Sequence, residues 1–365
     1  MSPVLELEFV GPTEAHGAVE ASPFDAVLLD GGLPAARLKA LLAELVDPGR
    51  GRPATVVMAD PSCWSALRGA LGGDADAFAE TGASPQQVLD RIATALDVRR
   101  LKADLSRSSA QVEGLAAELA QVKLRMAEEL RLAGTVQRSL HPPPRHHPRL
   151  DIGREFIPVR DIGGDYYDFV PLDAERLVFA VGDVMGKGMP AALLAANLKA
   201  SLRAQLHSGD VHPEDLLSRV NRLFFEVTPK GRFSSLFVSV FRLDRGVLEY
   251  ANAGHPPPFL VRPDGTLKDL DEGGTALGLV EDASYARGEV PLLPEDLLVF
   301  FSDGVTDRTN REGELFGLER LKRTAAGSRS DPARIALYSI LGDLQGWSAG
   351  SPPEDDMTLI VTKVR

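Results

Sequence analysis

The sequence predicts an α+β domain over residues 150–365, preceded by a small α/β domain and a long helix. Short strands alternate with helices up to residue 96, heptad-spaced apolar residues follow, and many short strands with grouped helices fill the remainder. Alternating strands and helices are typical of a parallel α/β domain, whereas strands with grouped helices favour a layered α+β fold. We therefore expect three domains, over residues 1–96, 97–141 and 150–365.

The composition is that of an ordinary globular protein and excludes several classes. Apolar residues make up 44% of the 365 residues and charged residues 25%. The net charge of -12 argues against a general nucleic-acid binder, because phosphate backbones need clustered Lys and Arg. No apolar run reaches the roughly 18 to 20 residues that span a bilayer, and the one cysteine, Cys63, excludes a disulfide framework. We expect a cytoplasmic protein that binds neither nucleic acid nor membrane.

The first region has the pattern of a small parallel α/β domain. We expect strands at Leu5–Val10, Ala26–Leu29 and Ala54–Met58, and helices at Arg37–Val46, Trp64–Leu71 and Pro85–Leu96. The run from Ala26 to Pro34 resembles the phosphoacceptor strand of response-regulator receiver domains, with Asp30 at the acceptor position. An early acidic pair and a late Lys, which receivers use, are missing. The resemblance therefore implies a degenerate or truncated receiver, and whether Asp30 is phosphorylated stays open.

The second region carries the most regular periodicity of the chain. The spacing alternates between three and four residues at Val98, Leu101, Leu105, Ser108, Val112, Leu115, Leu119, Val122 and Met126. Such a heptad stripe predicts a coiled coil, and a parallel homodimer through residues 98–126 is its simplest form. The alternative is a helix that packs on its own neighbouring domains. The helical pattern ends where Pro142 begins a run of three prolines.

The third region is rich in short strands. We expect strands at Leu177–Val181, Leu236–Phe241, Phe259–Val261, Leu297–Phe301 and Thr358–Val364. We expect helices at Pro190–Leu206, Pro213–Phe225 and Pro332–Leu344.

Aspartates beside glycines recur at the ends of the strands of this third region. The positions are Asp165, Asp183, Asp303 and the pair Asp355-Asp356. Hard divalent cations such as Mg²⁺ and Mn²⁺ prefer oxygen ligands, and the near absence of Cys argues against zinc. Each Asp-Gly pair alone is more often a turn, but four strand ends repeat the same chemistry.

Five motifs in this region occur together in a fixed order. They are Gly164-Asp165-Tyr166-Tyr167-Asp168-Phe169, Gly182-Asp183-Val184-Met185-Gly186-Lys187-Gly188-Met189-Pro190-Ala191-Ala192-Leu193, Asn252-Ala253-Gly254-His255-Pro256-Pro257, Ser302-Asp303-Gly304-Val305-Thr306-Asp307 and Asp355-Asp356-Met357-Thr358. Together they closely resemble the bacterial branch of the metal-dependent protein phosphatases, the PPM family, typified by the sporulation stage II and stress-response serine phosphatases. The resemblance covers residues 150–365. It implies a four-layer αββα sandwich with a centre for two Mn²⁺ or Mg²⁺ ions at one edge.

The resemblance also implies roles for individual residues. Asp183 resembles the aspartate that bridges both ions, and the backbone carbonyl of Val184 would help to hold one of them. Asp303 resembles a ligand of the second ion. Asp355 is our first choice as the ligand in the last motif, with Asp356 as the neighbour that steadies it, and the reverse order stays open. The implied catalytic positions are therefore Asp183, Asp303 and Asp355.

The remaining acidic positions resemble supporting sites. Asp165 resembles the acidic position near the ions and would contact them through water, while Asp168 and Asp307 are expected either to support the ligands from behind or to be structural. The implied mechanism is in-line attack on phosphorus by a water activated between the two ions, with no protein nucleophile.

The sequence departs from the family pattern where a proton donor is expected. Many eukaryotic relatives have a histidine shortly after the bridging aspartate, and Met185 occupies that place here. Lys187 and His255 are the candidate replacements. Arg160 lies where a phosphate-binding arginine could sit.

The resemblance implies a phosphoserine or phosphothreonine substrate on an anti-sigma-factor antagonist, and we expect the first domain to regulate turnover. One alternative is a nucleotide cyclase, since Gly163-Gly164-Asp165 is similar to the first half of the cyclase motif Gly-Gly-Asp-Glu-Phe. It leaves the motifs around Asp303 and Asp355 unexplained. A second alternative is a catalytically inactive phosphatase-fold signalling or binding module. All candidate ligand positions remain acidic, which argues against this alternative.

Overall fold

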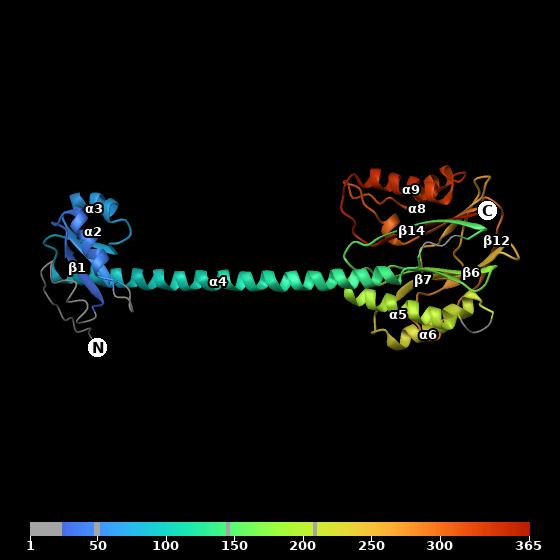
Figure 1. The fold of residues 1–365 in the computed structure, drawn as a ribbon, viewed down its shortest axis with the longest axis horizontal. Coiled ribbons are helices and arrows are strands. Elements are labelled where there is room, and N and C mark those ends of the chain that lie inside the picture. The colour runs from blue at the N-terminus through green and yellow to red at the C-terminus, as the bar shows by residue number, and fades with distance from the viewer. Residues whose placement is uncertain (1–23, 47–51, 144–146, 207–209) are drawn as a thin grey trace. The chain divides into compact units, whose positions relative to one another are not determined.

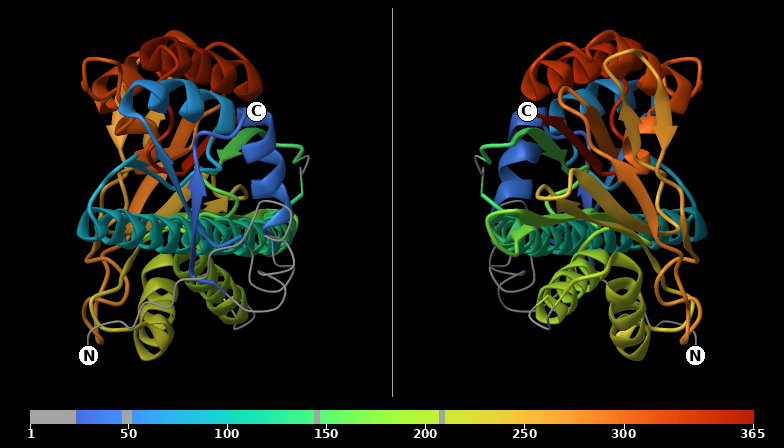
Figure 2. Two further views of the ribbon diagram at one scale, coloured as in Figure 1. Left: turned by 90° about the vertical axis from the view of Figure 1, so that its left-hand side faces the viewer. Right: turned by 90° about the vertical axis from the view of Figure 1, so that its right-hand side faces the viewer.

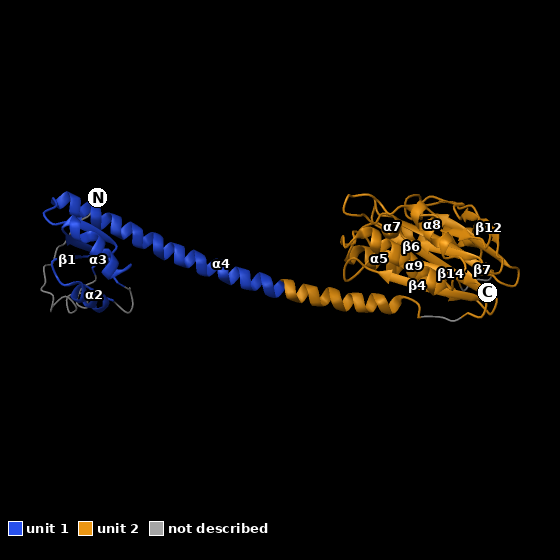
Figure 3. Ribbon diagram, turned by 90° about the horizontal axis from the view of Figure 1, so that it is seen from above, with its two compact units in different colours: residues 1–122 blue, residues 123–365 orange. Residues whose placement is uncertain are grey.

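The structure is a computed structural model that describes residues 24–46, 52–143, 147–206 and 210–365. The strand predicted at Leu5–Val10 lies outside the described residues. The chain forms two compact units, residues 1–122 and 123–365 (Figure 3). None of the helices in the described ranges combines the length and the apolar character of a membrane span.

The first unit is built on a parallel three-stranded sheet in the order β1-β2-β3. Its elements are β1 (Ala26–Asp30), α2 (Ala35–Glu44), β2 (Ala54–Ala59), α3 (Trp64–Leu71) and β3 (Ala77–Glu80). Leu38 and Leu42 of α2, Val57 of β2 and Phe78 of β3 share one buried core. The predicted parallel α/β character is therefore observed. Strand β3 was not predicted, because its four residues contain one large apolar side chain.

A single helix, α4 (Pro85–Leu140), follows β3. The sequence predicted two helical segments here, and the structure joins them without a break. Residues 85–122 of α4 belong to the first unit and residues 123–140 to the second.

The second unit contains two sheets whose strands are almost all antiparallel. One has five strands in the order β10-β9-β13-β14-β4, and the other has the path β11-β8-β7-β6-β5 with β12 also paired to β8. The strands are β4 (Leu150–Ile157), β5 (Tyr166–Pro171), β6 (Arg176–Val184), β7 (Ser234–Arg242), β8 (Val247–Ala253), β9 (Phe259–Val261), β10 (Leu267–Asp269), β11 (Gly273–Gly274), β12 (Gly288–Pro291), β13 (Leu297–Phe301) and β14 (Met357–Val364). The helices are α5 (Met189–Gln205), α6 (Pro213–Val227), α7 (Asp303–Thr306), α8 (Leu318–Gly327) and α9 (Ala333–Ser348).

Three buried apolar clusters hold these elements together. Between the sheets, Phe179 of β6 and Phe300 of β13 pack with their ring centroids 4.2 Å apart. Helices α5 and α6 cover the outer face of the sheet that contains β5 to β8. Helices α8 and α9 cover the outer face of the five-stranded sheet that contains β13 and β14 (Figures 1 and 2). Antiparallel sheets that bury both faces in this way need a central core and two outer ones.

Candidate metal centre

The acidic motifs all lie where strands of the second unit begin or end. Asp183 is the next-to-last residue of β6, Asp165 directly precedes β5, and Asp303 begins α7 just after β13. Asp355 and Asp356 directly precede β14. Segments far apart in the sequence therefore bring five carboxylates to one end of the two sheets.

Asp356 fastens the start of β14 to the loop before β5. Its Oδ1 accepts a hydrogen bond from the Val159 N–H at 2.8 Å, and its Oδ2 accepts one from the Gly164 N–H at 2.7 Å. The residue is 6% exposed. Both oxygens of Asp356 thus have backbone partners, and the residue is more buried than Asp355, whose side chain is 39% exposed.

Asp165 is buried between the two sheets and is 2% exposed. Its Oδ2 accepts hydrogen bonds from the hydroxyl groups of Ser302 and Thr358, both at 2.6 Å. Burial raises the pKa of Asp165 well above its ordinary value, and the charge of Asp183 adds to this effect. Asp165 therefore joins the loop before β5 to β13 and β14, which supports an indirect role at the centre.

Asp183, Asp303 and Asp355 interact electrostatically with one another. Burial, followed in size by the charges of Asp303 and Asp355, raises the pKa of Asp183 to about 7. Burial also raises the pKa of Asp303, followed in size by the charge of Asp355. Among the described residues, the Oδ1 atom of Asp303 is buried without a hydrogen-bond partner. Carboxylates with these properties favour a bound cation.

The main chain leaves room beside Asp183. A Cβ atom on Gly164 would lie 2.8 Å from the Val184 carbonyl oxygen and 3.1 Å from Asp183 Oδ1. Glycine at this position therefore keeps one side of both oxygens open. The Val184 carbonyl and the Asp183 carboxylate are hard oxygen donors, as the predicted ions require.

Within the described ranges, no three His, Cys, Asp or Glu side chains converge on one point closely enough to hold an ion as they stand. A divalent ion would need a rotation of the carboxylates or additional water ligands, and Mg²⁺ ordinarily keeps several waters. The oxygen-only donors, the buried Asp303 oxygen without a partner and the open side of Gly164 together fit Mg²⁺ or Mn²⁺.

Two further aspartates of the motifs lie apart from this group. Asp168 is fully buried and accepts two hydrogen bonds from Arg203, at 2.6 and 2.8 Å, which join β5 to α5. Asp307 is exposed and accepts a hydrogen bond from the Thr306 hydroxyl at 3.2 Å. Both aspartates are therefore bound by protein groups outside the cluster of Asp183, Asp303 and Asp355.

The environment of His255 does not suit a proton donor. The ring is 3% exposed, and its Nε2 lies 3.0 Å from the carbonyl oxygen of Phe301. Because a carbonyl can only accept, Nε2 carries the proton, and Nδ1 accepts from the Ser235 hydroxyl at 2.9 Å. Burial lowers the pKa of His255 to about 4. The ring is therefore a neutral link between β7, the loop after β8 and β13.

We expect His255 to stay neutral down to a pH of about 4 in the folded protein. Because this pKa lies below the ordinary value of 6.5, its contribution to stability is present above pH 6.5 and is lost as the pH falls through 4. The ring-nitrogen shifts in a ¹⁵N NMR titration measure this directly. A midpoint near 6.5 would contradict the buried, neutral assignment.

Of the other two candidates from the sequence, Lys187 lies in the loop that follows Asp183, and Arg160 lies beside the end of that loop. The Lys187 ammonium is 3.0 Å from Asp355 Oδ2. Arg160 is exposed, and its Nη1 would lie 3.9 Å from a Cβ atom on Gly188. Lys187 therefore borders the acidic group, and Arg160 lies near Gly188.

Gln137 of helix α4 contacts the loop that precedes Asp165, and no sequence pattern points to this residue. Its side-chain amide donates to the Gly163 carbonyl at 2.7 Å and accepts from the Gly163 N–H at 3.0 Å. Gly163 directly precedes Gly164, whose N–H binds Asp356. A glutamine near the end of an exposed helix has no motif, so only the three-dimensional contact reveals it.

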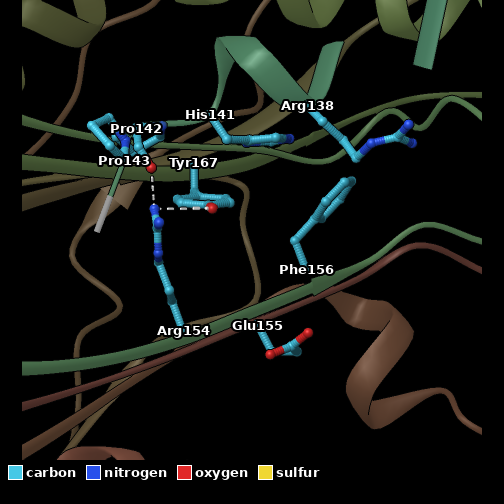
Figure 4. Close-up of a pocket in the computed structure, with 8 residues that line it drawn as sticks. All are labelled: Arg138, His141, Pro142, Pro143, Arg154, Glu155, Phe156 and Tyr167. Atoms are coloured by element: carbon cyan, nitrogen blue, oxygen red, sulfur yellow. Dashed lines mark hydrogen bonds between the residues drawn. The ribbon is translucent and has the colours of Figure 1, made fainter. Parts of the chain in front are cut away.

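A pocket of about 350 Å³ lies where α4 ends (Figure 4). Its His141 ring stacks on Tyr167, with centroids 4.6 Å apart and an interplanar angle of 14°. Burial lowers the pKa of His141 to about 4, so the stacked ring is neutral. Arg154 donates to the Pro142 carbonyl and to the Tyr167 hydroxyl. These contacts attach the end of α4 to β4 and β5.

Comparison with known proteins identifies the family of the chain. The sequence model of the family described as stage II sporulation protein E (SpoIIE) matches residues 173–365, more than half of the chain. The phosphoserine phosphatase RsbU of Bacillus subtilis is 32% identical over 247 residues, which cover 66% of this chain and 72% of RsbU. The phosphoserine phosphatase RsbP of the same organism is 25% identical, and the match covers 52% of this chain and 48% of RsbP.

Solved structures show the same fold. The RsbU and RsbW domains of a Mycobacterium tuberculosis protein align with a TM-score of 0.53 and 28% identity, covering 60% of each chain. The SiaA PP2C domain of Pseudomonas aeruginosa aligns with a TM-score of 0.60 and 21% identity, covering 67% of this chain and 98% of that one. The chain therefore belongs to the SpoIIE family, the bacterial branch of the PP2C-type protein serine/threonine phosphatases that its five motifs predicted.

Proposed function

We propose that the chain hydrolyses phosphoserine or phosphothreonine in a partner protein, with two Mg²⁺ or Mn²⁺ ions held by Asp183, Asp303 and Asp355. The observation that carries this is the buried Asp183 carboxylate, whose pKa is raised to about 7 beside two further carboxylates. The four-layer αββα sandwich implied by the resemblance is proposed as the scaffold. Its two sheets would bring the carboxylates to one edge.

The protein's own groups have separate tasks in this account. The charges of Asp303 and Asp355 both act on Asp183. Asp183 would contact both ions, with the Val184 carbonyl beside it. Asp356 and Asp165 hold the surrounding loops through the hydrogen bonds described above. When bound, the ions would activate a water for attack on phosphorus and neutralise the developing charge.

The proposed substrate is a phosphorylated anti-sigma-factor antagonist. The match to RsbU, which covers 72% of that phosphoserine phosphatase, supports the choice of a phosphoserine protein. A direct test is to assay the purified chain against a panel of phosphorylated antagonists, with Mg²⁺, Mn²⁺ or excess EDTA. Hydrolysis that requires a metal is expected. Turnover in excess EDTA would contradict the proposal, and binding without turnover in any metal would favour an inactive module.

Residues 98–126 are proposed to form a parallel homodimer. The apolar stripe of α4 is mostly exposed in the single chain, with exposed fractions between 52% and 70% at Leu101, Leu105, Val112, Leu115, Leu119, Val122 and Met126. A stripe of this width and spacing is buried most simply by a second copy of the same helix.

We expect the full chain to be a dimer at tens of micromolar, and the double variant Leu115→Glu, Leu119→Glu to be a monomer. Two charges in the seam would be buried without partners, which costs several kcal/mol. Light scattering measures the mass. The control places Glu at Ala110 and Ala117, which lie opposite the stripe, and should remain dimeric. A monomeric wild type would contradict the coiled coil.

The first domain, proposed to span residues 1–96, is interpreted as a degenerate receiver. Its parallel strands support this, and Asp30 lies at the end of β1, where its Oδ1 accepts from the Gly32 N–H at 2.9 Å. Residues 97–141 would form the helical linker and residues 150–365 the catalytic domain. We propose that the linker carries regulation through Gln137 to Gly163.

We expect Gln137→Ala to change turnover at least about threefold while the protein stays folded and dimeric. The substitution leaves the buried N–H and carbonyl of Gly163 without their partner, which costs about 1–3 kcal/mol in that loop. Steady-state kinetics of the full chain measure the effect. Gln121→Ala, on the same helix but in the first unit, is the matched control. Equal rates in wild type and Gln137→Ala would contradict regulation through this contact.

A further inference from the structure

The loop between Asp183 and α5 presents Lys187 in a fixed position. Gly186 and Gly188 on either side have φ angles of 107° and 75°, which residues with a side chain rarely adopt. Arg232 donates to the Met185 carbonyl at 3.1 Å, and a Cβ atom on Gly186 would lie 2.4 Å from Arg232 Nη1. Lys187 is therefore held by a tightly turned and packed loop.

The side chain of Lys187 is directed to the end of the loop before β14. Its Nζ lies 3.0 Å from Asp355 Oδ2 and also donates to the backbone carbonyl of Glu354. The other oxygen of Asp355 accepts from the Asp356 N–H at 2.9 Å. Asp355 thus has a protein partner at each carboxylate oxygen, in contrast to the unpartnered Oδ1 of Asp303.

Lys187 also offsets part of the negative charge of the acidic group. Its charge acts on Asp303 as well as on Asp355, and lowers the pKa of Asp303 against the stronger effects of burial and of Asp355. An ion that binds Asp355 would supply positive charge at the same carboxylate. Two cations on one oxygen repel each other, so the ammonium and the ion must share or exchange this position.

We propose that Lys187 is an internal counter-cation that a divalent metal must displace from Asp355, and that this competition sets the affinity of one metal position. The inference rests on the proposed metal centre and adds a determinant of its affinity. The side chains of Lys187 and Asp355 are 40% and 39% exposed, so the competition is moderate in size.

The test is Mn²⁺ binding to the full chain, measured by the electron paramagnetic resonance signal of free Mn²⁺. Lys187→Met should lower the Kd of one Mn²⁺ position about threefold, the range expected for a half-exposed ion pair. The difference should shrink at high salt, because salt screens exposed charges. Lys187→Arg should keep the wild-type Kd, and Lys268→Met, at an exposed lysine on β10, is the control for loss of one positive charge.

A second readout is thermal unfolding, measured without metal and with Mn²⁺. In EDTA, Lys187→Met should lower the thermal unfolding midpoint, because Asp303 and Asp355 lose their nearest cation. In saturating Mn²⁺ the difference should disappear. Loss of the difference in Mn²⁺ would distinguish competition between Lys187 and the metal for Asp355 from a general loss of structure.

An unchanged or higher Kd for Mn²⁺ in Lys187→Met would overturn the inference. A raised KM for the phosphoprotein with an unchanged Kd for Mn²⁺ would instead make Lys187 a phosphate ligand. Asp183→Asn in the same titration reports on the metal centre itself. If Asp183→Asn binds Mn²⁺ as tightly as wild type, the proposed function fails; if it binds weakly while Lys187→Met is unchanged, only the role of Lys187 fails.

Discussion

Asp183→Asn is expected to lower metal-dependent turnover about a thousandfold or more. The carboxylate would contact both ions, and the loss of several kcal/mol of charge stabilisation in the transition state corresponds to such a factor. Steady-state hydrolysis of a phosphoserine protein in Mn²⁺ is the measurement. Asp307→Asn is the matched control, because Asp307 belongs to the same set of motifs but is exposed, and should retain turnover within about threefold.

The same substitution should stabilise the metal-free protein. Because the folded-state pKa of Asp183 is about 7 and the ordinary value is 3.8, its charged form opposes folding, and stability falls as the pH rises from about 4 to 7. Asn removes this charge, so the unfolding midpoint in EDTA at pH 8 should rise. A variant that keeps turnover within tenfold of wild type, or that is destabilised in EDTA, would contradict the role of Asp183.

Gly304→Ala is expected to remove activity through the backbone. A Cβ atom at this position would lie 2.0 Å from the Asp356 carbonyl oxygen, so α7 and the start of β14 would have to separate. These two segments carry Asp303 and Asp355. Overpacking of this kind costs about 1–3 kcal/mol, and the displaced carboxylates should weaken Mn²⁺ binding at least tenfold.

Gly342→Ala is the control for Gly304→Ala. Gly342 lies within α9, and a Cβ atom there meets nothing within 4 Å. Alanine in an exposed helix interior is favoured over glycine by about 0.5–1 kcal/mol, so this variant should be as stable as wild type or more stable. Equal Mn²⁺ affinity in Gly304→Ala and Gly342→Ala would show that Mn²⁺ binding does not need the close contact between α7 and the start of β14.

Strands with continuous apolar runs were predictable from the sequence, and strands with buried polar groups were not. The predicted bounds of β9 and β13 agree with the structure, since each is an uninterrupted run of large apolar residues. Strand β5 was missed because its buried Asp168 is compensated by Arg203 from α5, a distant partner. Strand β8 was missed because it carries Glu249 and Asn252, which are buried with partners outside the strand.

The residues of the candidate site likewise fall into those that a local sequence pattern reveals and those that only a distant contact reveals. The acidic motifs were visible because aspartate beside glycine at a strand end is a local pattern. The contacts of Asp356 were not, because its partners are the backbone N–H groups of Val159 and Gly164, nearly two hundred residues earlier. Gln137 and the ion pair of Lys187 with Asp355 are likewise contacts between distant segments.

The most direct test of the metal centre is a crystal of the chain grown with Mn²⁺ and measured at a wavelength where manganese scatters anomalously. We expect two strong anomalous peaks, both bordered by Asp183, with Asp303 and Asp355 beside them and Asp356 still bound to the Gly164 N–H. Peaks elsewhere in the chain, or none at this edge of the sheets, would contradict the account.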